Sequence, residues 1–139
     1  MRLLVLVLGL GVTLVLTAST AAVADPVRAT MLTSSTTALV DAPWRYTITV
    51  KDQAGKPVAA KVRLQILLRA LVVGCWKATG LVRCTGAKAG TWIAFRGKRT
   101  AAITWPARYS GMKLTFQAIV VSGTRALRLR APVTVRSSS

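Results

Sequence analysis

Apolar and polar side chains alternate on both sides of a short turn in the middle of the chain, and this alternation restricts the fold more than any other feature. The turn runs from Asp52 to Val58. It contains Gly55, which tolerates positive φ, and Pro57, which fixes its own φ and lacks an amide donor. A period of two is typical of strands that bury one face and wet the other. The segment therefore predicts two strands joined by a tight reversal. The side chains expected to face a core are Tyr46, Ile48, Val50, Val62, Leu64, Ile66 and Leu68.

The same period recurs through the rest of the chain, whereas helical spacing is hard to find. Pro132 marks an exposed edge or a bulge in the last alternating segment. About seven short strands with frequent turns favour an all-β, immunoglobulin-like two-sheet antiparallel β-sandwich over a barrel. The further alternating segments are residues 27–32, 91–96, 100–105, 113–120 and 127–136.

The N-terminus has the three parts of a secretory signal peptide. Arg2 precedes an uncharged apolar run, and small residues follow up to Ala24. We expect residues 1–24 to be removed and residues 25–139 to form one secreted or cell-wall-associated domain without a transmembrane helix. An uncleaved membrane anchor is the alternative. It is disfavoured because threonine and serine dilute the second half of the segment, and the strongly apolar part is shorter than the roughly 20 residues that span a bilayer.

Cys75 and Cys84 are the two cysteines of the chain, and export favours a disulfide between them. If Thr79 and Gly80 form a two-residue hairpin loop, Cys75 lies directly opposite Cys84 on the neighbouring strand. Closing a loop of about ten residues would stabilise the fold by about 2 to 3 kcal/mol in the chain-entropy picture. Free thiols are the alternative. A zinc site is disfavoured because two sulfurs without histidine leave the ion short of ligands.

The stretch from Tyr46 to Val58, followed by the strand at Val62, resembles the bacterial immunoglobulin-like domains found in adhesins of the invasin and intimin type. In those domains it marks the B strand, its turn and the C strand. Residues 104–107 and 114–118 look like the E and F strands of small secreted single-domain relatives. The resemblance implies an immunoglobulin-like sandwich and little about activity, because that architecture hosts many unrelated functions. No tandem repeat is present, so the resemblance does not extend to repeat arrays.

The chain lacks histidine and glutamate, and its carboxylate side chains are those of Asp25, Asp41 and Asp52. A serine or cysteine nucleophile would have no imidazole base, and calcium or zinc would have too few ligands. Asp52 suits a turn in which its side chain bonds nearby backbone. We therefore expect no catalytic residues, no metal ligands and no cofactor. A small enzyme with a lysine–aspartate centre is the alternative, and a pocket that joins Asp41 with a lysine and a serine would support it.

Positive charge is the functional signal that remains. Lys and Arg number 20 against 3 acidic residues, a net charge of +17, and loss of Arg2 with the leader lowers it to +16. Small domains stay soluble with a net charge of about 2 to 8 in magnitude. The outward rows predict a basic surface that attracts polyanions, and plain solvation of these charges is the competing interpretation. The predicted anion-contact residues are Arg45, Lys51, Lys61, Arg63, Arg69, Arg128, Arg130 and Arg136.

Together these features favour a non-enzymatic secreted module that binds an anionic cell-envelope polymer, a lipid surface or a protein. A recognition or inhibitory domain that binds one protein through its loops is the alternative. Nucleic acid is disfavoured because the chain has no reading helix and no alternation of exposed aromatics with arginines. We expect Trp44, Trp76, Trp92 and Trp105 to pack in the core and against the sheets, with Trp76 as a candidate exposed contact.

Overall fold

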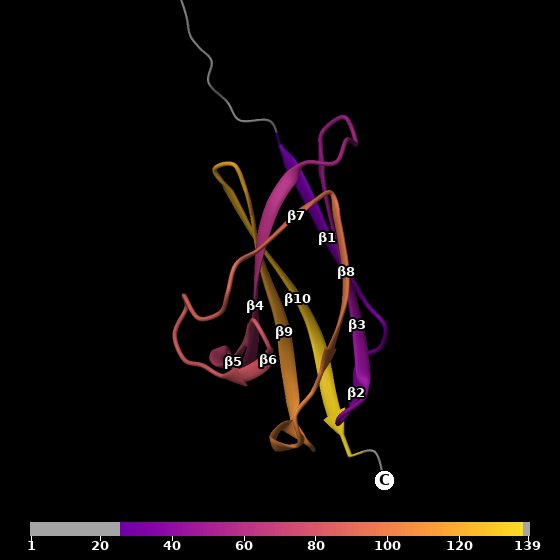
Figure 1. Ribbon diagram of the computed structural model, residues 1–139, viewed down its shortest axis with the longest axis vertical. Helices are drawn as coiled ribbons and strands as arrows, with labels where there is room; N and C mark the ends of the chain where they lie inside the picture. The colour runs from indigo at the N-terminus through magenta and orange to yellow at the C-terminus, as the bar shows by residue number, and fades with distance from the viewer. Residues whose placement is uncertain (1–25, 138–139) are drawn as a thin grey trace, which may run out of the picture.

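The computed structural model describes residues 26–137, so the predicted signal peptide and Asp25 lie outside the described residues. Within this part, strands and one short 3-10 helix build an elongated molecule (Figure 1). No helix in this part is long and apolar enough to cross a bilayer. The elements are β1 (Val27–Thr33), β2 (Thr37–Leu39), β3 (Pro43–Asp52), β4 (Ala59–Leu68), β5 (Leu71–Lys77), β6 (Gly80–Arg83), β7 (Ile93–Arg96), β8 (Lys98–Thr104), η1 (Ala107–Tyr109), β9 (Lys113–Ser122) and β10 (Arg125–Arg136).

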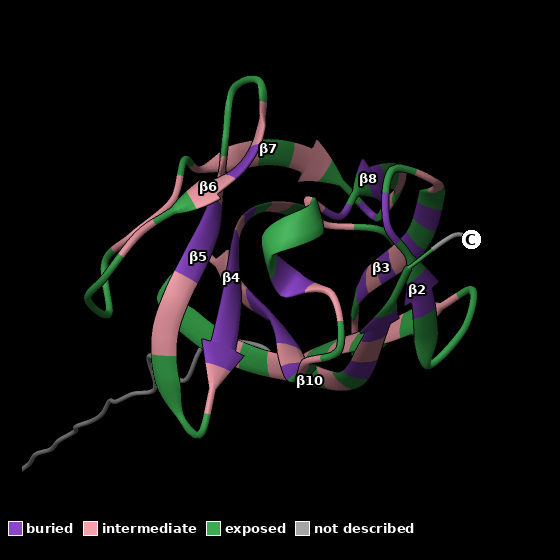
Figure 2. Ribbon diagram, turned by 90° about the horizontal axis from the view of Figure 1, so that it is seen from below, coloured by how far each residue is buried: buried purple, intermediate pink, exposed green. Residues whose placement is uncertain are grey.

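The strands form two sheets that face each other (Figure 2). One sheet has the order β1-β3-β8, and the other has the order β2-β10-β9-β4-β5-β6 with β7 paired to β4. Strands β3 and β4 lie in different sheets, as the B and C strands of immunoglobulin domains do. Strand β9 lies between β4 and β10, as F lies between C and G. The predicted immunoglobulin-like sandwich is therefore confirmed.

The strands are more numerous than the predicted seven or so, and one pair is parallel. β2 has three residues, too few to show alternation, and it pairs in parallel with residues 134–136 at the end of β10. The other strand pairs are antiparallel. Pro132 pairs with Thr115 on one side and lies just before the β2 pairing begins. Its predicted place on a strand edge, where a missing amide donor costs little, agrees with this arrangement.

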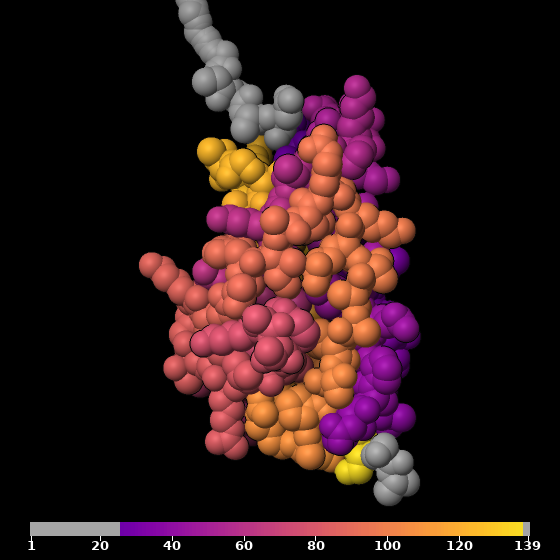
Figure 3. Space-filling view, in the orientation of Figure 1, coloured from indigo at the N-terminus to yellow at the C-terminus, as the bar shows by residue number. Residues whose placement is uncertain are grey.

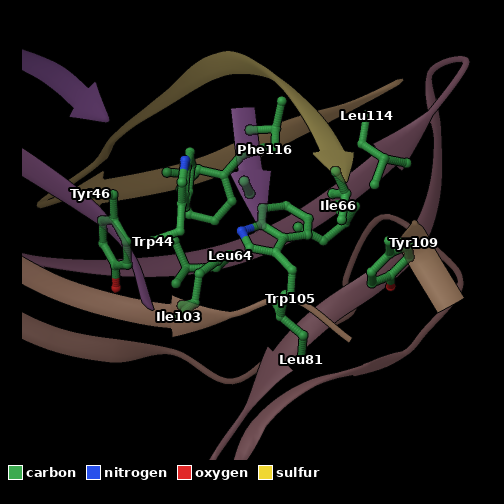
Figure 4. Close-up of a cluster of buried hydrophobic side chains, with 14 of the residues drawn as sticks. Trp44, Tyr46, Leu64, Ile66, Leu81, Ile103, Trp105, Tyr109, Leu114 and Phe116 are labelled. Atoms are coloured by element: carbon green, nitrogen blue, oxygen red, sulfur yellow. The ribbon is translucent and has the colours of Figure 1, made fainter. Parts of the chain in front are cut away.

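The predicted inward rows meet between the sheets and form the core. Ile48, Val62 and Leu64 are fully buried. At the centre, the ring of Trp44 on β3 meets that of Phe116 on β9 edge-on, with centroids 5.1 Å apart, and Trp105 lies 5.5 Å from Trp44 (Figure 4). Strands β3 and β9 correspond to the B and F strands that a disulfide joins in antibody domains. Here an aromatic cluster links them instead, and each such pair contributes about 0.5 to 1.5 kcal/mol beyond its buried area.

The β5–β6 hairpin has a different register from the predicted one. Residues 78–79, not residues 79–80, form the turn, and Cys75 faces Val82 rather than Cys84. The predicted register is wrong because it assumes that Gly80 supplies a positive φ inside the turn. In the structure Gly80 has a φ of 144° but is the first residue of the second strand. The predicted disulfide is nevertheless present, with Cα atoms 5.6 Å apart. That separation lies within the usual range for a bridge, so the cysteines join diagonally.

Two further features close the ends of the sandwich. The Oδ1 atom of Asp52 accepts hydrogen bonds from the amides of Ala54 and Lys56, each over 2.9 Å, which is its predicted role in the turn. At the opposite end, η1 lies across the opening between the sheets (Figure 2). Its Tyr109 is buried. A side chain at Gly74 would collide with the Tyr109 hydroxyl, so glycine allows this closure.

Candidate anion-binding face

The predicted cations are divided between the two outer faces of the sandwich. All are exposed except Arg63, which is half-buried. Arg45 and Lys51 lie on the outer face of the three-stranded sheet, and Arg69 lies in the β4–β5 turn. The remaining five share the outer face of the larger sheet, because their strands pair so that these side chains have the same parity. They are Lys61, Arg63, Arg128, Arg130 and Arg136.

Strand pairing adds two exposed cations that the sequence analysis did not include. Arg96 of β7 pairs with Ala59 and so has the same parity as Lys61. Lys113 of β9 pairs with Thr134, two residues from Arg136. Alternation within each segment was visible in the sequence, but it does not reveal which strand lies beside which. We call the outer face of the larger sheet the basic face, defined by Lys61, Arg63, Arg96, Lys113, Arg128, Arg130 and Arg136.

Cations on the two sides of β9 stand level with each other on this face. Arg63 of β4 and Arg128 of β10 pair with the same residue of β9, Ile119. Neighbouring strands lie about 4.8 Å apart, so the backbones of β4 and β10 are about 10 Å apart there. The outward residues of β9 between them are uncharged from Thr115 to Val121. The face therefore presents two cationic rows along an uncharged strip.

The next level along the strands holds a chain of hydrogen bonds that we call the glutamine relay, formed by Gln65, Gln117 and Arg130. Arg130 donates from Nε to Oε1 of Gln117 over 2.7 Å, and Gln117 donates from Nε2 to Oε1 of Gln65 over 2.9 Å. Gln65 in turn donates from Nε2 to the carbonyls of Ala87 and Ala89, both at 2.9 Å. Gln65 and Gln117 are 1% and 2% exposed, although their rows were predicted to face water.

These glutamines are buried because residues 84–92, the covering loop, cross the outer side of the larger sheet. The loop joins β6 to β7, and its neighbourhood forms the protrusion on one flank of the molecule (Figure 3). Gly90 allows the close approach, since its φ is 108° and a Cβ there would lie 3.0 Å from Cγ of Arg63 and 3.2 Å from the carbonyl oxygen of Leu64. The covering loop is thus held to the sheet by the relay and by a glycine contact.

Trp92 lies outside the core and packs against two residues of β4 on the basic face. Nζ of Lys61 is 4.7 Å from the centroid of its ring, and Cζ of Arg63 is 4.2 Å away. Both distances are within the range of a cation–π contact. Nε of Arg63 is buried and has no hydrogen-bond partner among the described residues. Trp44 and Trp105 are in the core as predicted, and Trp76 is half-buried at its edge.

A groove of about 430 Å³ lies between the covering loop and β10. Its polar floor consists of Gln65 and Gln117, and its charged residues are Arg128 and Arg130. The described carboxylates, Asp41 and Asp52, belong to other parts of the molecule and do not line it. The cations of the groove therefore have no acidic neighbour in its wall. The apolar part of the wall includes Leu67, Leu71, Val72 and Ile119.

Other pockets of the molecule lack a comparable set of binding or reactive groups. The pocket of about 290 Å³ that contains Asp41 includes neither a lysine nor a serine, so the residues that would have supported a lysine–aspartate centre do not meet there. A mostly apolar pocket of about 490 Å³ lies beside η1, with Arg83, Arg108 and Tyr109 in its wall. Within residues 26–137, no group of three or more histidine, cysteine or acidic side chains could hold a metal ion.

Comparison with known proteins carries no functional argument for this chain. No family model matches the chain, and no curated protein matches it. A solved CARDB domain from Pyrococcus furiosus, in complex with di-metal ions, is similar at 16% identity and a TM-score of 0.46, over 82% of this chain and 96% of that one. A calcium-binding mutant of β-glucuronidase 2 from Bacteroides uniformis is similar at 10% identity and a TM-score of 0.29, over 75% of this chain and 12% of that one. Neither similarity is high enough to carry a ligand or an activity to this chain.

Proposed function

We propose that the mature chain is a non-enzymatic, extracytoplasmic immunoglobulin-like module that binds an anionic polymer of the cell envelope through the basic face. The observation that carries this proposal is the gathering of seven cations on one outer face whose groove has no acidic residue in its wall. Such an arrangement creates a positive potential that concentrates polyanions near the surface.

A polymer fits this face better than a single small anion. Six of the seven cations are exposed, and they are distributed over β4, β7, β9 and β10. The two rows beside β9 are separated by about 10 Å, a distance that a chain with repeated negative charges can match at several points. One aromatic ring, Trp92, lies among these cations, whereas single-stranded nucleic acids are bound on series of exposed rings.

The distribution of acidic groups supports a binding role over a catalytic one. The carboxylate of Asp52 is engaged with two amides of its own turn. Asp41 lies in a pocket without a lysine, and the sequence supplies no histidine or glutamate to act as a general base. Binding by fixed cations requires none of these groups.

Retention of residues 25–139 on purified cell wall at different salt concentrations tests this function. Salt screens the attraction between charges beyond about 30 Å at 0.01 M and beyond about 3 Å at 1 M, so we expect retention at the low concentration and complete elution at the high one. Wall material stripped of its anionic polymers is the control and should retain little. Absence of retention at low salt would contradict the proposal, and retention that survives high salt would point to a protein partner instead.

A further inference from the structure

We propose that the groove between the covering loop and β10 binds one tetrahedral oxoanion, a phosphate or sulfate group carried on a carbohydrate chain. Arg130 is its principal ligand and Gln117 is the residue that positions Arg130. The inference rests on the proposed function, because it assigns one discrete subsite within the basic face. The remaining cations of the face then meet further charges of the same polymer.

The glutamine relay fixes the part of Arg130 that a ligand can meet. A guanidinium group has five N–H donors in a rigid fork, and the Nε donor of Arg130 is already bonded to Gln117. The edge formed by the two Nη nitrogens remains, and this edge pairs well with two oxygens of an anion. Arg130 is fixed at Nε by Gln117, and it is accessible because it is exposed and lines the groove.

Because the two glutamines are buried, the folded protein requires the hydrogen bonds of the relay, and the relay is not an incidental surface contact. A polar group costs free energy to bury unless its hydrogen bonds are made. Both N–H donors of Gln65 reach carbonyls of the covering loop, and its oxygen accepts from Gln117. The relay ends at a cation whose orientation is set before a ligand arrives, so less side-chain entropy is lost on binding. Arg130 satisfies Oε1 of the buried Gln117 through its Nε alone, and its Nη nitrogens are not needed by the relay.

The number of cations favours a tetrahedral anion over a carboxylate. Arg128 lies two residues from Arg130 on the same side of β10, about 7 Å along the strand, and both line the groove. A carboxylate has two oxygens, which one guanidinium fork occupies in full. A phosphate or sulfate group has further oxygens for the second arginine.

The apolar wall indicates what carries the anion. Leu71 at the rim is 70% exposed, and Leu67 and Ile119 contribute apolar surface within the groove. Sugar rings present C–H faces beside their hydroxyl groups, and such faces can cover this surface while the charged substituent meets the arginines. The cations beyond the groove match the continuation of the chain, which a single isolated ion would not use.

Variants that keep the net charge separate a fixed site from general attraction. Arg130→Lys removes the fork and the bond to Gln117, whereas Arg125→Lys makes the same change at an exposed position of the same strand, outside both the groove and the basic face. Gln117→Leu leaves every charge in place and removes the acceptor that orients Arg130. The probes are phosphorylated dextran, dextran sulfate and carboxymethyl dextran of matched charge density, with phosphatidylglycerol vesicles as a lipid probe.

We expect Arg130→Lys to weaken binding of phosphorylated or sulfated dextran about tenfold, as for the loss of a charge-assisted hydrogen bond, while Arg125→Lys changes it less than about twofold. Gln117→Leu should weaken it comparably if its circular dichroism shows a native sheet. Phosphate and sulfate are distinguished by which dextran the native protein binds more tightly. Equal binding by native protein, Arg130→Lys and Arg125→Lys would overturn the discrete site while leaving the proposed function intact.

Two other outcomes would overturn the ligand assignment. Equal affinity for carboxymethyl dextran would show that the groove does not select tetrahedral anions. Tighter binding to phosphatidylglycerol vesicles than to any dextran would favour a lipid surface as the partner. Failure of the native protein to bind any of the probes or the cell wall at low salt would remove both this inference and the proposed function.

Discussion

The two outer faces of the sandwich both carry cations, but only one of them organises these cations around a groove with buried polar groups. On the three-stranded sheet, the outward residues of β1, β3 and β8 are mostly threonines and basic residues. Among them, the hydroxyl groups of Thr47 on β3 and Thr100 on β8 form a hydrogen bond of 3.0 Å. On the basic face, the covering loop buries Gln65 and Gln117 and ties Arg130 to them. Both faces are thus positively charged, but only the basic face has a cation that buried side chains hold in place.

The difference follows from the order of the strands in the chain. The chain leaves the larger sheet after β6, crosses the outer side of β4 and returns as β7 before it enters the other sheet at β8. This path lays the covering loop over the basic face. The described residues place no comparable segment over the threonine-rich face, whose side chains are exposed or half-buried. A fixed site therefore arises where a loop excludes water from a few polar groups, and charge alone does not produce it.

The largest expected effect comes from breaking the relay at Gln65. In Gln65→Leu the carbonyls of Ala87 and Ala89 and one amide hydrogen of Gln117 lose their partner, and each buried unpaired group costs about 1 to 3 kcal/mol. We expect the free energy of unfolding to fall by about 3 kcal/mol in urea titrations. The matched change on the other face, Thr47→Val, should cost less than about 1 kcal/mol. Equal losses would contradict the contrast between the faces.

A second, smaller effect is expected at Gly90. Its φ of 108° and the close contacts of an added Cβ make Gly90→Ala unfavourable, and we expect a loss of about 2 to 3 kcal/mol together with faster amide exchange in the covering loop. Gly123 is the control, because its φ of 58° is strained for alanine but nothing lies within 4 Å of an added Cβ. Gly123→Ala should cost about 1 kcal/mol. A covering loop that exchanges no faster in Gly90→Ala would show that this contact does not hold it.

The sequence predicted the buried rows of the strands correctly, but it did not predict the glutamine relay on the basic face. Alternation identified the buried row of β4 because every second residue there must enter the core. The same pattern assigned Gln65 and Gln117 to the outer side, which is correct, but it could not reveal a loop that covers them. Their pairing joins positions 52 residues apart, and only the register of β4 with β9 brings them together. The sequence likewise could not show on which side of a sheet Trp92 packs, and in the structure it lies against two cations of the outer face.

A third prediction compares the faces in binding. Arg128→Gln with Arg130→Gln removes two charges from the groove, and Arg45→Gln with Lys51→Gln removes two from the opposite face. We expect the first pair to weaken retention on cell wall at least about tenfold, which corresponds to about 1.4 kcal/mol, and the second pair about twofold. Elution in a salt gradient measures both. Equal shifts would mean that the protein binds through net charge without a preferred face.

The smallest effect is expected at the β4–β5 turn beside the groove. Arg69 and Ala70 both have positive φ, 52° and 69°, in a two-residue hairpin turn that favours Asn-Gly. Arg69→Asn combined with Ala70→Gly should therefore stabilise the fold by up to about 1 kcal/mol in urea titrations. The double variant should bind nearly as tightly as the native protein, because Arg69 does not line the groove. A large loss of affinity would show that Arg69 belongs to the site.

Amide hydrogen exchange of residues 25–139, with and without a saturating anionic wall polymer at low salt, tests the central claim most directly. The account predicts that the polymer slows exchange in the covering loop, in β10 and in the β4–β5 turn, while β1 and the outer edge of β8 exchange unchanged. Protection centred on β1 and β3, or spread evenly over both faces, would contradict it.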